Sequence, residues 1–113
     1  MHRKVAILNL EQDMPTVEQA MYKLKNALST SKRQGSKAVI VIHGYGSSGV
    51  GGGIKAAVGK QLRDRSLQGV VRAYVGGEQW PERKRELLGM CKALENHERQ
   101  VAENSGVTVV ILR

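Results

Sequence analysis

KAVIVIHGYGSSGVGGG, residues 37–53, is the stretch that decides the fold. Its first part, residues 37–42, is a continuous run of apolar and β-branched side chains, typical of a strand buried on both faces. Six of the eleven residues from His43 to Gly53 are glycine. Glycine adopts positive φ at no steric cost and lets backbone N–H groups approach a ligand closely. The stretch therefore predicts a central strand that runs into a glycine-rich loop.

Strand-like and helix-like segments alternate on both sides of this stretch. Residues 4–10, 70–75 and 107–112 are apolar runs of strand length. A capping box at residues 16–19 opens a helix that ends near Gly35, and an apolar stripe marks a second helix after Gly53. Pro81 opens a third, expected over residues 81–104. The order β-α-β-α-β-(inserted α)-β predicts an α/β sandwich of two or three layers around a four-stranded, mostly parallel or mixed sheet.

Length and composition narrow the class of protein. The chain has 113 residues, which fits a single domain over residues 1–113. It has one cysteine, Cys91, so it cannot be a disulfide scaffold, and we expect Cys91 to be a core residue. No run approaches the roughly 18 apolar residues of a membrane span, and the N-terminus does not read as a signal sequence. We therefore expect a cytoplasmic protein with no membrane partner.

The net charge of +8 is concentrated in one part of the chain. Residues 35–76 contain six lysines and arginines and a single acid, Asp64, whereas basic and acidic residues cancel over residues 81–104. A basic surface attracts polyanions, and a phosphate backbone is the commonest of these. The charge therefore favours nucleic acid as the partner, with RNA and DNA both open.

The glycine loop is the predicted phosphate site. It leaves the end of a strand and enters a helix, whose N-terminus carries partial positive charge. Ser47 and Ser48 can donate hydrogen bonds, Tyr45 can stack on a base, and Lys55 is expected in the first turn of the helix. The predicted substrate-binding residues are His43, Gly44, Tyr45, Gly46, Ser47, Ser48, Gly49, Lys55, Lys60 and Arg63.

Three well-known loops fit this stretch poorly. Residues 44–49 match GxGxxG, but the next strand ends without the acid that a dinucleotide fold places on the ribose. The strand-then-HG opening is also found in lipases, but the chain has no GxSxG elbow. A Walker A loop needs Gly-Lys-Ser/Thr, whereas Gly59-Lys60 precedes Gln61 inside the second helix.

The chain resembles the Smr (small MutS-related) domain family. Thr16-Val17-Glu18-Gln19-Ala20 matches the family's helix start, His43-Gly44-Tyr45-Gly46 matches its HGxG loop, and residues 108–112 resemble its last strand. The resemblance spans most of residues 4–76 and 106–112, which marks residues 78–105 as a helical insertion. It implies nucleic-acid binding and, as in several members, endonuclease activity with or without a metal ion.

One motif departs from the family. Where Smr domains read LDxH, this chain reads Leu8-Asn9-Leu10-Glu11. If the first two strands are parallel, Glu11 lies at the same edge as His43, and this pair is the candidate catalytic site that could position water or hold a divalent ion. No metal site and no definite cofactor is predicted. Three functions stay open: a binding module that has lost catalysis, an active endonuclease, and a binder of nucleotides or phosphorylated metabolites.

Overall fold

The sheet is mixed and has a single reversed strand. The structure, a computed structural model, describes residues 4–13, 15–44 and 49–113. In this part of the chain, β1 (Val5–Asn9), β2 (Ala38–Ile42), β3 (Val71–Gly76) and β4 (Val107–Leu112) form one sheet in the order β1-β2-β4-β3. β1 pairs with β2 in parallel, and β4 is antiparallel to both β2 and β3. The carboxyl ends of β1, β2 and β3 therefore share one edge of the sheet with the start of β4.

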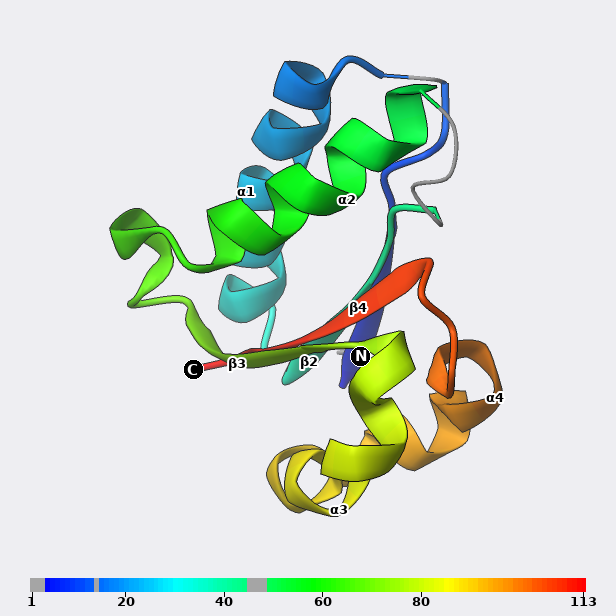
Figure 1. The fold of residues 1–113 in the computed structure, drawn as a ribbon. Helices are drawn as coiled ribbons and strands as arrows, with labels where there is room; N and C mark the ends of the chain where they lie inside the picture. Colours follow the sequence, from blue (N-terminus) through cyan, green and yellow to red (C-terminus); the bar gives the residue numbers. More distant parts are fainter. Residues whose placement is uncertain (1–3, 14, 45–48) are drawn as a thin grey trace.

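Helices cover both faces of this sheet, so the sandwich has three layers (Figure 1). α1 (Val17–Arg33) connects β1 to β2, and α2 (Gly49–Leu62) leads from β2 through the 3-10 turn η1 (Arg65–Leu67) to β3. Both connections step across the sheet in the same direction. Right-handed crossovers then place both helices on the same face. The other face is covered by α3 (Trp80–Met90) and α4 (Glu98–Val101).

The sheet separates two apolar clusters, as the period of two in a strand requires. In β2, Val39 and Val41 pack beneath α1 and α2, whereas Ala38 and Ile40 pack toward α3 and α4. All six residues of β4 are buried. The predicted strand that is buried on both faces is confirmed, because β2 lies inside the sheet with a helical layer on each side.

The start of α1 follows the predicted capping box. The Gln19 backbone N–H donates to Thr16 Oγ1 at 3.1 Å, and the Thr16 N–H donates to Gln19 Oε1 at 2.9 Å. Such a cap typically stabilises a helix by about 1 kcal/mol. Ala20, Leu24 and Leu28 follow on one stripe and are fully buried, which fixes the face that α1 presents to the sheet.

The prediction of one helix over residues 81–104 is wrong. α3 ends at Met90, Cys91 is extended (φ −149°, ψ 94°), and a 3-10 segment, η3 (Lys92–His97), leads into the short α4. A straight helix of that length would measure about 36 Å, as long as the longest axis of the molecule, 35 Å. The bend at Cys91 keeps Leu87, Leu94 and Val101 on a sheet of short strands. Cys91 is buried, as expected, and so is Trp80.

The glycine loop is also shorter than predicted. α2 begins at Gly49, so the glycines at 51, 52 and 53 belong to the helix. Lys55 is its seventh residue and lies in the second turn, not the first. Each glycine costs a helix about 1 kcal/mol, but the burial of Ile54 and Val58 outweighs that preference. A Cβ at Gly53 would lie 3.1 Å from Val17 Cγ2, so this glycine also permits close packing of α1 on α2.

Within the described residues, no helix combines the length and the apolar character that a bilayer crossing requires.

Candidate nucleic-acid interface

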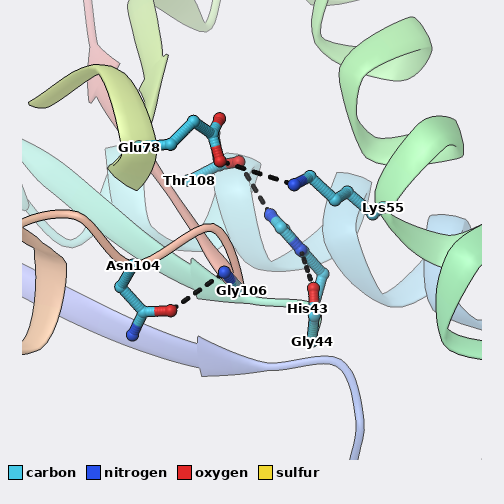
Figure 2. A network of polar contacts seen from close by, with 7 residues as sticks. All are labelled: His43, Gly44, Lys55, Glu78, Asn104, Gly106 and Thr108. Atoms are coloured by element: carbon cyan, nitrogen blue, oxygen red, sulfur yellow. Dashed lines mark hydrogen bonds and ion pairs between the residues drawn. The ribbon is translucent and has the colours of Figure 1, made fainter. Parts of the chain in front are cut away.

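The polar residues of the predicted site gather where β1, β2 and β3 end and β4 begins. His43 and Gly44 directly follow β2, Glu78 lies in the turn after β3, and Thr108 is the second residue of β4. Figure 2 shows these side chains around the His43 ring, with Lys55 reaching toward them from α2. In an α/β sheet, ligands collect at this edge, beyond the carboxyl ends of the strands.

His43 is fully buried, and both of its ring nitrogens have partners. Nδ1 lies 2.9 Å from the Gly44 carbonyl oxygen, and Nε2 lies 2.8 Å from Thr108 Oγ1 (Figure 2). A carbonyl can only accept, so Nδ1 carries the proton, and Nε2 of the neutral ring accepts from the Thr108 hydroxyl. Burial lowers the pKa of His43 below its ordinary value, and Lys55 acts in the same direction. The hydrogen bond to Gly44 and the carboxylates of Glu78 and Glu11 oppose this change.

The backbone after His43 is held in a defined turn. The N–H groups of His43 and Gly44 both donate to the Gly106 carbonyl, at 2.9 and 3.0 Å. Gly106 is itself held by Asn104, whose Oδ1 accepts from the Gly106 N–H at 2.9 Å (Figure 2). Gly44 has a φ of +84°, a region that favours glycine. The first half of the HGxG motif is thus an anchored backbone turn.

Glu11 reaches the same turn from β1. The strand register pairs Asn9 with Ile42, which brings the two loops side by side. A Cβ on Gly44 would lie 2.6 Å from Glu11 Oε2, so a side chain there would require the Glu11 carboxylate to move. The edge shared by Glu11 and His43 is therefore present. Glu11 is exposed, however, and the His43 nitrogens bond to Gly44 and Thr108 instead of a carboxylate.

Asn9 has a structural task in this chain. Its Oδ1 accepts from the backbone N–H groups of Glu11, at 2.8 Å, and Gln12, at 3.2 Å. This is a side-chain-capped turn of the kind that Asn and Asp favour. The Asn9 carbonyl accepts from Lys23 Nζ at 2.9 Å, which ties the turn to α1. The residue that stands in place of the family's aspartate thus shapes the chain that carries Glu11.

The predicted basic residues do not form one group. Lys55 pairs with Glu78 at 3.4 Å, with both side chains more than a third exposed (Figure 2). Lys60 is exposed in the last turn of α2, about 16 Å along the axis from Gly49. Arg63 is exposed just beyond the end of α2. Of the three, only Lys55 lies near His43.

Four predicted site residues, Tyr45, Gly46, Ser47 and Ser48, lie outside the described residues, and Gly49 is the first residue of α2. Within the described ranges, no three His, Cys, Asp or Glu side chains gather in a group that could hold a metal ion. The residues placed here therefore offer no built metal site.

Sequence reasoning missed the residues that hold the turn, Thr108, Asn104 and Gly106, and the close packing at Gly77. A signal existed for Thr108, since it is the lone polar residue in an otherwise aliphatic strand, VTVVIL. Gly77 is buried, and a Cβ there would run into the carbonyl oxygens of Val101 and Asn104. That contact joins segments distant in the sequence, so no local pattern could have revealed it.

The fold and this edge define the chain as a three-layer α/β domain with an anchored His-Gly turn in front of a helix. The Smr domain family matches residues 12–113, and the chain belongs to this family. The crystal structure of the Smr domain of Thermus thermophilus MutS2 is similar, with a TM-score of 0.57 and 22% identity over 98% of this chain and 99% of that one. At that identity the likeness shows a shared fold. No curated protein sequence matches this chain.

Smr domains generally bind nucleic acid, and some members are nucleases. The resemblance drawn from the short HGxG and helix-start motifs is therefore confirmed at the level of the family and the fold.

Proposed function

We propose that this Smr domain binds nucleic acid at the turn after His43 and the start of α2, and that it does not cut the bound strand. The observation that carries the proposal is the buried His43 ring with both nitrogens engaged. A general acid or base must reach the proton that it transfers. His43 would have to break a contact with Gly44 or Thr108 to do so, and it serves here as an anchor for the turn.

Backbone groups are the expected phosphate ligands. The first N–H groups of α2 have no partner within the helix, and the helix dipole adds partial positive charge at that end. Lys55 is the nearest cation of the predicted set, and its exposed pairing with Glu78 is weak enough to be exchanged for a phosphate. Glu11 and Glu78 repel an anion at the same place. We therefore expect binding here to depend more on the shape of the turn and its backbone N–H groups than on charge.

The test is a salt titration of binding to single-stranded and duplex oligonucleotides. We expect the logarithm of the association constant to fall linearly with the logarithm of salt concentration. Gly44→Ala should weaken binding about tenfold or more, since alanine is strained at positive φ and would displace Glu11. Gly69→Ala is the matched control, because a Cβ there meets nothing within 4 Å.

Lys55→Gln provides a second variant that leaves the turn intact, and it should reduce the salt slope by about 0.9 on duplex DNA. Absence of binding at low salt would refute the proposal. Stabilisation by mononucleotides without oligonucleotide binding would identify a nucleotide binder instead.

Cleavage is tested separately on labelled RNA and on nicked or branched DNA, with and without divalent ions. We expect no cleavage by the parent protein. Activity that disappears in Glu11→Gln but persists in Glu78→Gln would contradict the non-cutting part of the proposal, because both carboxylates lie near His43 and only Glu11 stands in the family's motif.

A further inference from the structure

The positive charge of this chain lies mainly away from the His43 turn. Between Glu18 and Glu78 there are ten lysines and arginines and a single acid, Asp64. The acids next to this segment in the sequence lie at the end of the sheet that carries His43. Glu11 and Glu78 lie close to His43, and Glu18 is in the first turn of α1. The turn is thus flanked by acids, and two of the ten cations, Lys55 and Lys23, have partners at this end of the sheet.

Three of the cations lie in a row at the end of the sheet opposite to His43. Lys4, Lys37 and Arg113 flank β1, β2 and β4, which are neighbours in the sheet. Their backbones are tied together: the Lys37 N–H donates to the Lys4 carbonyl at 2.8 Å, and the Leu112 N–H donates to the Lys37 carbonyl at 2.9 Å. Neighbouring strands lie about 4.8 Å apart, so the three residues begin within about 10 Å of one another. All three are exposed.

The ends of the two long helices add to this row. α1 finishes with Lys32 and Arg33, only a few residues before Lys37, and Arg65 lies in η1 after the end of α2. Figure 1 shows the ends of both helices on the same side of the molecule as the C-terminus and the start of β3. We call this surface the basic edge, and it consists of Lys4, Lys32, Arg33, Lys37, Arg65 and Arg113.

No ion pair among the described residues neutralises the basic edge. The ion pairs formed by the described residues are Lys55–Glu78, Arg83–Glu86 and Lys84–Glu98, and none involves a basic-edge residue. Arg33 and Arg113 donate to neutral oxygens, those of Thr30 and Gln68. Asp64 caps η1 by accepting from the Ser66 N–H at 2.8 Å, and this hydrogen bonding lowers the pKa of Asp64.

Local structure explains only part of this charge. A helix dipole favours cations in the last turn, which accounts for Lys32 and Arg33. Strands have only small net dipoles, so Lys4, Lys37 and Arg113 have no such reason to be cationic. Six unneutralised cations on one edge repel each other, and a bound polyanion would relieve that repulsion.

We propose that the basic edge is a second contact surface for the phosphate backbone of the nucleic acid, distinct from the His43 turn. The inference rests on the proposed function and adds to it. Lys37 and His43 lie at opposite ends of β2, about 20 Å apart. Duplex DNA carries one charge per roughly 1.7 Å of its axis, so that span covers about twelve phosphate charges. The basic edge supplies most of the affinity, without sequence preference, while the turn makes the local contact.

The test compares two triple variants of equal charge. Lys32→Gln/Lys37→Gln/Arg65→Gln removes three exposed basic-edge cations whose side chains form no ion pair within the described residues. Arg85→Gln/Lys92→Gln/Arg99→Gln removes three exposed cations from the α3 and α4 side, again without an ion pair among those described. Both should melt within a few degrees of the parent, since exposed, unpaired positions are exchanged.

For a duplex oligonucleotide, the basic-edge variant should lose up to about 2.7 from the salt slope and at least tenfold in affinity at low salt. The control should stay within about twofold of the parent. Equal losses in the two variants would show that only net charge matters and would overturn the proposal.

Two further outcomes separate this inference from the proposed function. Binding that is lost in Gly44→Ala but unchanged in the basic-edge variant would overturn the second surface and leave the turn in place. No binding of any oligonucleotide by the parent protein would overturn both. A third outcome is that the parent protein binds anionic phospholipid vesicles but no oligonucleotide, and that the basic-edge variant no longer binds the vesicles. That outcome would assign the surface to a membrane instead.

Discussion

Thr108→Val removes the hydroxyl group that holds the His43 ring and changes little else. Valine has nearly the shape of threonine and is favoured in strands, so β4 should keep its pairing with Val41 and Gly76. His43 Nε2 would then be buried without a donor, since its contact to Thr108 Oγ1 at 2.8 Å is the partner that the structure provides. Leaving a buried polar group unsatisfied costs about 1–3 kcal/mol.

That free energy converts into a shift that calorimetry can resolve. Unfolding entropies near 2.1 cal/mol/K per residue amount to about 0.24 kcal/mol/K for a chain of this length, so each kcal/mol lowers Tm by about 4 °C. Thr108→Val should therefore melt about 4–13 °C below the parent. The same loss should appear as a lower urea midpoint with an unchanged m-value.

Thr108→Ser is the matched control, because it keeps the hydroxyl and loses one methyl group. It should be destabilised by about 1 kcal/mol or less. If Thr108→Val is as stable as the parent, or if serine is as damaging as valine, the hydroxyl does not anchor His43. The interpretation of residues 43 and 44 as an anchored backbone turn would then be wrong.

Three other perturbations test separate parts of the structure. Because the folded state lowers the pKa of His43, the unfolded chain binds that proton more readily, so stability is full above about pH 6.5 and falls below it. Urea unfolding between pH 5 and 8 should show this fall, with a slope of at most about 1.4 kcal/mol per pH unit, and His43→Gln should flatten it. Gly77→Ala should cost more than about 3 kcal/mol, because its Cβ meets two carbonyl oxygens; normal expression and melting would contradict that packing. Gly89→Ala, exposed in α3 with open space around it, should stabilise the domain by about 0.5–1 kcal/mol in the same urea assay, and a loss would question the helical assignment there.

The parts of the fold that the sequence predicts are those in which local preference and burial agree. The β-branched run of β2 and the capping box of α1 are examples, since each is read from consecutive residues and each reappears in the structure. The glycines at the start of α2 are the opposite case. Their intrinsic preference indicates a loop, but packing of Ile54 and Val58 extends the helix over them.

The candidate site shows the same division. His43 and Gly44 stand out in the sequence because a glycine motif follows a strand. Thr108 is 65 residues further along, and the register of β4 beside β2 brings it to His43. The distribution of charge is likewise a product of topology. Residues 35–76 are basic in the sequence, but the fold places Lys37 and Arg65 at the basic edge and Lys55 beside His43.

The place of β4 in the sheet also sets the order in which the domain can be completed. β4 is the last strand of the domain, yet it lies between β2 and β3, which share no direct pairing. Until residues 107–112 are in place, β3 has no partner and β2 has one open side. Such unpaired edges invite association between chains. A truncation before Val107 would therefore leave two separate pieces of sheet, and the domain depends on its final strand for cooperative folding.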